Sequence, residues 1–207
     1  ELEQAIREQF LVRTRPLADL TESRTTWISQ WKSALAGDPS QYWKVIQPES
    51  VTSKEGATTR VDPRGTVVIS GKFPDYDDYT VTLPVSEGTL SAIRLSALTN
   101  DSLQYKGPGR NANFVLTGVK LSLKTGEGDP IPVELSTAKA DFTQQGFDVA
   151  ETLNPESKSG WAVWDGESKT AVDRQVIFIL AESLEVPPDA KLVLSLQHRS
   201  EHAKHIL

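Results

Sequence analysis

The feature that most constrains the fold is an alternation that begins near residue 40. From there on, short runs rich in β-branched and aromatic residues alternate with clusters of Gly, Pro, Asn and Asp. No helical pattern separates one run from the next. Short apolar runs bounded by turn-forming residues are typical of strands, and strands without helical crossovers pair antiparallel. The sequence therefore predicts a mainly β fold, an antiparallel β-sandwich or jelly roll, and not a parallel α/β fold.

The turn-forming clusters divide this region into individual strands. The predicted strands cover residues 42–48, 66–71, 78–84, 90–98, 114–123, 133–139, 160–164, 175–180 and 191–198. Two connections, residues 100–113 and 141–159, are long for a compact domain. Loops longer than about 12 residues are usually functional or held by specific contacts, so we expect these two loops to matter for function.

The beginning of the chain has a different pattern. Its apolar residues recur at helical spacing, and Pro16 is expected to divide the segment into two helices. Gly37 followed by Pro39 is a helix stop signal. We therefore predict a short helical connector over residues 1–39 and one β-sandwich domain over residues 40–207.

Charge and composition exclude several classes of function. A net charge of -6 at pH 7 argues against nucleic acid and against an anionic membrane surface as partners. The chain has no cysteine, which excludes disulfides, zinc–thiolate sites and cysteine nucleophiles. No apolar stretch approaches the roughly 18 residues of a membrane span. The chain starts at Glu1 without a signal peptide, and we interpret it as a fragment or mature segment of a larger protein.

The sequence offers little that favours catalysis. His198, His202 and His205 all lie at the C-terminal end, and no G-x-S-x-G pattern of a serine hydrolase occurs. Two of these histidines have a spacing that could bind a metal from one helical face, but Arg199 and Lys204 would repel it, and we favour a solvated tail. No pattern among the acidic residues selects a glycosidase-type pair. We predict that the chain is not an enzyme.

Aromatic residues near turns are the useful signal for sugar binding. The C–H face of a pyranose packs on a flat indole or phenol ring, as apolar groups do on aromatic side chains generally. Trp164, Tyr76, Tyr79 and Tyr105 lie in or beside turn-rich segments and are predicted to contact a ligand. The alternative for each ring is packing in the core or at its rim. Trp161, at the start of a strand, is expected to be buried.

Two further loops carry polar groups that could bind something. The segment Gly107–Arg110 is glycine-rich, but no helix pattern follows it, so we interpret it as a rigid turn and not as a phosphate loop. Arg110 would hold that turn by donating to carbonyl or carboxylate groups, and a ligand contact is the alternative. Residues 154–161 supply carboxylate, hydroxyl and carbonyl oxygens of the kind that calcium takes, with an ordinary polar turn as the alternative.

One ordered set of segments resembles a known module. The segments are LSAIRLSAL at 90–98, GPGRNANFVLT at 107–117, ADFTQ at 140–144 and GWAV at 160–163. Their order resembles the galactose-binding-like module of large planctomycete-type bacterial proteins that also carry a cytochrome c domain. The resemblance covers roughly residues 42–207.

The resemblance implies a jelly roll, an extracytoplasmic location in the periplasm or at the cell surface, and other domains of a parent protein as partners. The fold is also similar to that of discoidin-type modules, many of which hold a structural calcium at a turn. Asn154, Glu156 and Ser159 match the ligand-bearing positions by residue type, although Asn in place of Asp removes a charge. Related modules continue into one more strand after the position of Leu207, which would leave a sheet edge open here.

Together these observations lead to one functional expectation and an alternative. We expect a carbohydrate-binding module that grips a polysaccharide or oligosaccharide through loop aromatics and polar side chains and cleaves nothing. The alternative is a structural spacer or protein-docking domain, which the helical face of Trp27 and Trp31 would support if it were exposed. Because fold does not determine function, both expectations need a site to support them.

Overall fold

A computed structural model describes residues 43–166, 172–202 and 204–207. The chain divides into two compact units, Glu1–Val45 and Ile46–Leu207. The predicted helical connector and the predicted boundary between residues 39 and 40 lie outside the described residues, and so does the Trp27/Trp31 face. Everything below concerns the second unit.

This unit is built almost entirely from short strands. The strands are β1 (Ser50–Ser53), β2 (Thr58–Val61), β3 (Val67–Ser70), β4 (Asp77–Pro84), β5 (Gly88–Ala97), β6 (Val115–Leu116), β7 (Gly118–Lys124), β8 (Ile131–Val133), β9 (Leu135–Ala140), β10 (Trp161–Ala162), β11 (Arg174–Val186) and β12 (Lys191–His198). Two short 3₁₀ helices, η2 (Gln104–Lys106) and η3 (Val149–Leu153), lie in the long loops. The prediction of a mainly β, antiparallel fold is therefore confirmed for the described part of the chain.

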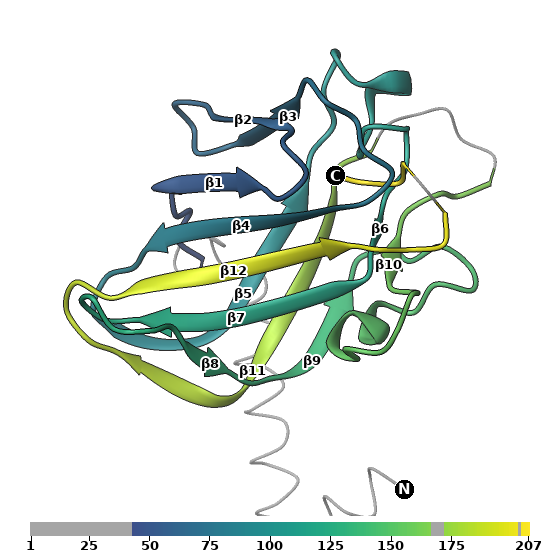
Figure 1. The fold of residues 1–207 in the computed structure, drawn as a ribbon. Helices are drawn as coiled ribbons and strands as arrows, with labels where there is room; N and C mark the ends of the chain where they lie inside the picture. Colours follow the sequence, from purple (N-terminus) through teal and green to yellow (C-terminus); the bar gives the residue numbers. More distant parts are fainter. Residues whose placement is uncertain (1–42, 167–171, 203) are drawn as a thin grey trace, which may run out of the picture. The chain divides into compact units, whose positions relative to one another are not determined.

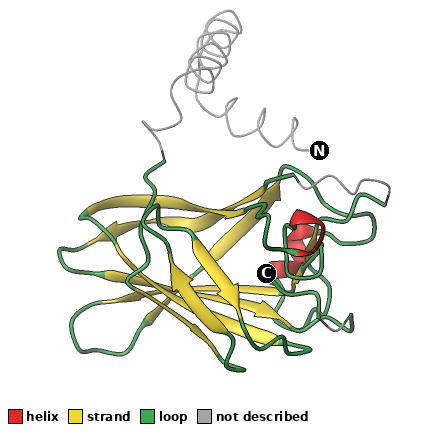
Figure 2. Ribbon diagram, turned by 90° about the horizontal axis from the view of Figure 1, so that it is seen from above, coloured by secondary structure: helices red, strands yellow, loops and turns green. Residues whose placement is uncertain are grey.

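The strands form several antiparallel sheets. The largest has the order β1-β4-β12-β7-β8, and a second has the order β5-β11-β9. Figures 1 and 2 show the second sheet crossing behind the first, with the two stacked as layers. Two small pairs, β2-β3 and β10-β6, complete the arrangement. The architecture is sandwich-like.

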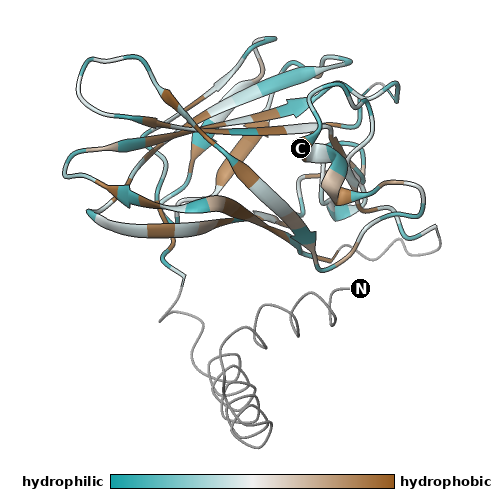
Figure 3. Ribbon diagram, turned by 90° about the horizontal axis from the view of Figure 1, so that it is seen from below, coloured by the Kyte–Doolittle hydropathy of each residue, from teal (hydrophilic) through white to brown (hydrophobic). Residues whose placement is uncertain are grey.

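The core lies between the two larger sheets because their strands alternate inward and outward. In β12, Leu192, Leu194 and Leu196 are buried, whereas the residues between them are partly exposed. Val176 and Phe178 of β11 meet them in the same buried cluster. In Figure 3 the hydrophobic segments lie mostly on the strands, and the loops are largely hydrophilic. This period-2 burial is what holds the strands in register.

Some predicted boundaries are wrong for identifiable reasons. No strand occurs over the described part of 42–48, and β1 begins only at Ser50. β11 continues to Val186, well beyond the predicted end at residue 180, because Leu184, Glu185 and Val186 pair with β5 again after an irregularity in register. Glu182 and Glu185 lie exposed on this long strand.

The end of the chain packs against the sandwich instead of forming another strand. The N–H groups of Arg110 and Val115 donate to the carbonyl oxygens of Ile206 and His205, respectively. Ile206 is buried, and the hydroxyl of Tyr79 donates to the carbonyl oxygen of Leu207. These contacts fix the last residues at the end of the sandwich where β12 stops, which is also where the candidate site lies.

Candidate functional site

An open pocket of about 380 Å³ lies at one end of the sandwich. β4 starts there, β12 ends there, and the turn after β1 approaches from the side (Figure 1). The pocket is lined by Lys54, Glu55, Tyr76, Asp77, Asp78, Lys158, Arg199, Ser200 and Glu201. Four separate parts of the chain thus contribute to it. One lining side chain, Tyr76, is aromatic, and the others are charged except for the hydroxyl of Ser200.

Asp77 lies buried at the first position of β4 and organises the turn after β1. Its carboxylate accepts the hydroxyl of Ser53 at 2.6 Å and the backbone N–H groups of Glu55 and Asp78 at 3.1 and 2.9 Å. A buried carboxylate needs several donors, and this one has three among the described residues. Asp77 is therefore a structural residue that fixes Glu55 at the pocket.

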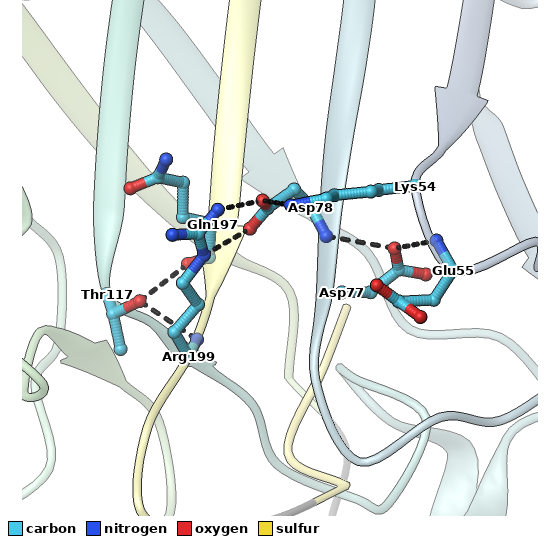
Figure 4. A network of polar contacts seen from close by, with 7 residues as sticks. All are labelled: Lys54, Glu55, Asp77, Asp78, Thr117, Gln197 and Arg199. Atoms are coloured by element: carbon cyan, nitrogen blue, oxygen red, sulfur yellow. Dashed lines mark hydrogen bonds and ion pairs between the residues drawn. The ribbon is translucent and has the colours of Figure 1, made fainter.

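Asp78 forms the charged centre of the pocket, as Figure 4 shows. Its carboxylate accepts from Nε and Nη2 of Arg199, with Nε 2.9 Å away, and Nζ of Lys54 lies 3.7 Å from it. Partial burial would raise the pKa of Asp78, but the hydrogen bond and charge of Arg199, with help from Lys54, hold that pKa below its usual value. Asp78 is consequently ionised near neutral pH, and the Arg199 guanidinium is held by both carboxylate oxygens.

The backbone of Arg199 is fixed by Thr117, which lies between β6 and β7. Oγ1 of the buried Thr117 donates to the carbonyl oxygen of Gln197 and accepts the N–H of Arg199, each at 3.0 Å (Figure 4). Arg199 follows the last residue of β12, so these bonds determine where its side chain leaves the sheet. The pocket therefore has a rigid polar wall built from the ends of two strands.

His198 lies directly behind this wall. It is paired in register with Asp77, is only 1% exposed, and its ring centroid lies 5.3 Å from that of Tyr79. Neither ring nitrogen has a hydrogen-bond partner among the described residues. Burial lowers the pKa of His198 to about 4, although the charges of Asp77 and Asp78 partly oppose that effect. The ring is consequently neutral at pH 7.

The rim of the pocket combines an aromatic ring with exposed charges. Tyr76 is 46% exposed, which leaves much of its ring in contact with solvent. Nζ of Lys158 lies 3.7 Å from a carboxylate oxygen of Glu201, and both side chains are largely exposed. Of the predicted ligand contacts, Tyr76 is the one that the structure places in this pocket.

The prediction that Tyr79 contacts a ligand is wrong. Tyr79 lies inside β4, is 2% exposed and points into the core, and its hydroxyl is satisfied by the carbonyl oxygen of Leu207. Burial raises the pKa of Tyr79 well above its usual value. A sequence signal for this existed, because Tyr79 and Val81 are both inward residues of one alternating strand.

Trp164 and Tyr105 are exposed but do not line the pocket. Trp164 is 42% exposed, and its backbone N–H donates to Oε1 of Gln144 at 3.2 Å. That oxygen also accepts from Nδ2 of the buried Asn113, so the position of Trp164 is fixed. Tyr105 is 56% exposed in η2. As expected, Trp161 is fully buried, and its Nε1–H donates to the carbonyl oxygen of Phe142.

Arg110 has the role expected of a residue that holds its loop. Its guanidinium donates to the carbonyl oxygens of Lys72 and Gly71 at 2.6 and 2.9 Å and lies 4.6 Å from the centroid of the Phe73 ring. These contacts join the loop of residues 107–110 to the segment after β3. They use donors that a ligand would otherwise need.

The predicted calcium turn is held by its own hydrogen bonds. Oδ1 of Asn154 accepts the N–H of Glu156 at 3.2 Å, and Oγ of Ser157 accepts the N–H of Ser159 at 3.1 Å. Within the described ranges, no group of three or more His, Asp or Glu side chains gathers as a metal site would require. Glu156 and the carbonyl groups of the turn are suitable calcium ligands by type, and calcium binding stays a prediction.

The lining residues that the sequence did not point to are Lys54, Glu55, Asp77, Asp78, Lys158, Arg199, Ser200 and Glu201. Arg199 was expected to lie in a solvated tail. No local pattern connects these two residues, which are far apart in the sequence and meet only because β4 and β12 pair antiparallel. Their juxtaposition needs the register of the sheet.

Comparisons with known proteins add nothing to this geometry. No protein-family model matches the chain, and neither a curated protein nor a solved structure matches it. In the part of the chain that the structure describes, no helix has the length and apolar character to span a membrane. The function must therefore be argued from the site.

Proposed function

We propose that residues 46–207 form a non-catalytic carbohydrate-binding module whose site is the pocket around Tyr76 and Asp78. The observation that carries the proposal is an exposed aromatic ring in an open pocket whose other walls are hydrogen-bonding side chains. This is the combination that a sugar requires, since one face of a pyranose is apolar and its edge carries hydroxyl groups. The volume of about 380 Å³ is within the range of small-molecule sites.

The chemistry of the two inner carboxylates supports binding without bond cleavage. Glycoside hydrolysis needs a carboxylic acid that stays protonated near neutral pH, and therefore one with a raised pKa. Arg199 and Lys54 instead lower the pKa of Asp78. The oxygens of Asp77 are occupied by Ser53 and two backbone N–H groups. Neither carboxylate is arranged as a general acid.

The wider parts of the proposal come from the resemblance described above. They are the jelly-roll assignment, an extracytoplasmic location, a parent protein with several domains, and a structural calcium at Asn154, Glu156 and Ser159. The stacked antiparallel sheets are compatible with a jelly roll. An antibody against this domain, used on fractionated cells of the source organism, would test the location. The alternative of a spacer or docking domain gains no support from the described residues.

Affinity electrophoresis against a panel of polysaccharides tests the binding function. We expect at least one polysaccharide to retard the protein and Tyr76→Ala to abolish the retardation, because that variant removes the aromatic platform. Tyr76→Phe should retain it, since the ring remains. Tyr105→Ala is the matched control, because Tyr105 is also an exposed tyrosine but does not line the pocket. Absence of retardation by every member of the panel would refute the proposal.

A further inference from the structure

We infer that the pocket selects sugars without anionic groups and binds them through pairs of neighbouring hydroxyl groups; this inference rests on the proposed function. It concerns the charge of the ligand, which the sequence left open.

The charges that line the pocket nearly cancel. Three cationic side chains face four carboxylates, one of which is the buried and fully bonded Asp77. The cations are not free: Lys54 and Arg199 both contact Asp78, and Lys158 lies beside Glu201. A site for sulfate or uronate groups needs cations in excess of nearby carboxylates, and this lining has none in excess.

Each ion pair offers a donor next to an acceptor. A sugar hydroxyl both donates and accepts, so it can accept from a cation and donate to the adjacent carboxylate without separating the pair. Two neighbouring hydroxyls can do this at one ion pair, where one accepts from the Arg199 guanidinium and the other donates to the Asp78 carboxylate; the pair of Lys158 and Glu201 offers the same combination. The pairs then serve as ready-made partners for a diol.

Arg199 contributes most to this arrangement because its position is fixed. A guanidinium has five N–H donors, and two of its nitrogens, Nε and Nη2, donate to Asp78. Nη1 has no partner among the described residues, and the side chain is about half exposed at the pocket. The Asp78 carboxylate thus orients the guanidinium of Arg199, and Nη1 can donate to a hydroxyl oxygen of the sugar.

A charged sugar would meet an unfavourable partner at either position. A sulfate or uronate that approaches Arg199 also approaches the ionised Asp78, and one that approaches Lys158 also approaches Glu201. Glu55, whose side chain has no ion-pair partner among the described residues, adds a further negative charge against anionic ligands.

The experiment compares neutral and charged polysaccharides by affinity electrophoresis with the protein and with Tyr76→Ala. The neutral probes are galactomannan, xyloglucan, dextran and a β-glucan; the charged probes are the anionic carrageenan, polygalacturonate and dextran sulfate. Retardation by a neutral probe and by none of the charged probes, abolished in Tyr76→Ala, supports the inference. Retardation by a charged probe that is lost in Tyr76→Ala overturns the inference while the proposed function stands. Retardation by no probe overturns both.

Salt separates hydrogen bonding from charge attraction in the same assay. For a neutral sugar, raising NaCl to about 0.5 M should change the affinity of the protein less than twofold, because salt screens attraction between charges. A tenfold or larger loss of affinity would mean that charge attraction drives binding and would overturn the inference.

Discussion

Acidification should destabilise this domain through one buried histidine. His198 is 1% exposed, packs beside the ring of Tyr79, and has no hydrogen-bond partner for either ring nitrogen among the described residues. Protonating it inside the fold would place a charge out of contact with water, and the charges of Asp77 and Asp78 and the backbone of Asp77 offset only part of that cost. In the unfolded chain the same ring is in water and takes up a proton readily. Lowering the pH therefore favours the unfolded state.

The magnitude follows from the two pKa values. Burial lowers the pKa of His198 to about 4 in the folded state, against about 6.5 for a solvated histidine. A depressed histidine pKa means that the unfolded state binds the proton first as the pH falls. Stability is thus complete above about pH 6.5 and is lost progressively down to about pH 4. The difference corresponds to about 3 kcal/mol, which is a large part of the stability of a typical domain.

Urea denaturation at pH 7, 6, 5 and 4.5 measures this dependence, with His198→Phe as the test variant. The quantity to compare is the slope of the unfolding free energy against pH. If the substitution changes the stability by the same amount at every pH, this slope stays the same. Burial and the nearby His202 also lower the pKa of His205, so part of the slope will remain in His198→Phe. His205→Gln is the matched control and should remove only the smaller part of the pH dependence of stability, the part that is due to His205.

Equal slopes in the unchanged protein and in His198→Phe would refute this reasoning. They would mean that His198 is solvated or bonded in a way that the described contacts do not contain. Loss of stability only below about pH 4 would lead to the same conclusion, because carboxylates and not histidines titrate there.

Three other predictions are open to direct measurement. Gly160→Ala should prevent folding or destabilise by more than about 3 kcal/mol in urea, since a Cβ atom would lie 2.0 Å from the carbonyl oxygen of Leu116; a near-normal midpoint would contradict this. Asp78→Asn should cost about 1 kcal/mol at pH 7 by removing the partner of Arg199, and the cost should shrink below the lowered pKa of Asp78 as the pH falls; a constant cost down to pH 2 would argue against an ion pair. If calcium binds its predicted turn, millimolar calcium should raise Tm by about 2–4 °C, and Glu156→Ala should remove the rise; identical melting with calcium and with chelator would exclude the site.

Local chemistry explains which features the sequence could predict. The alternation of strand-forming runs with Gly and Pro clusters was sufficient for the antiparallel β class, because strand propensity and turn chemistry act over a few residues. It also placed Trp161 inside and Arg110 at a loop junction. The alternation of side chains along β4 also predicts that Tyr79 points inward, because it lies two residues before the apolar Val81 on the same face.

The long strand β11 shows where local chemistry stops being informative. Its second half is largely polar, yet the strand continues because residues 184–186 pair antiparallel with residues 88–90 of β5. Pairing with a neighbouring strand contributes more there than the composition of the segment itself. Propensity in strands depends on context in this way more than propensity in helices does.

The amino-acid sequence by itself determined the class of fold, the absence of cysteine chemistry and the exposure of Trp164 beside a turn. Only the tertiary structure brought Asp78 to Arg199, placed Tyr76 in the same pocket, and buried His198 behind them. The physical reason is register: β4 and β12 pair antiparallel, so the start of one strand meets the end of the other across 121 positions of sequence. Such a meeting depends on which strands pair, and no short pattern of residues contains that information.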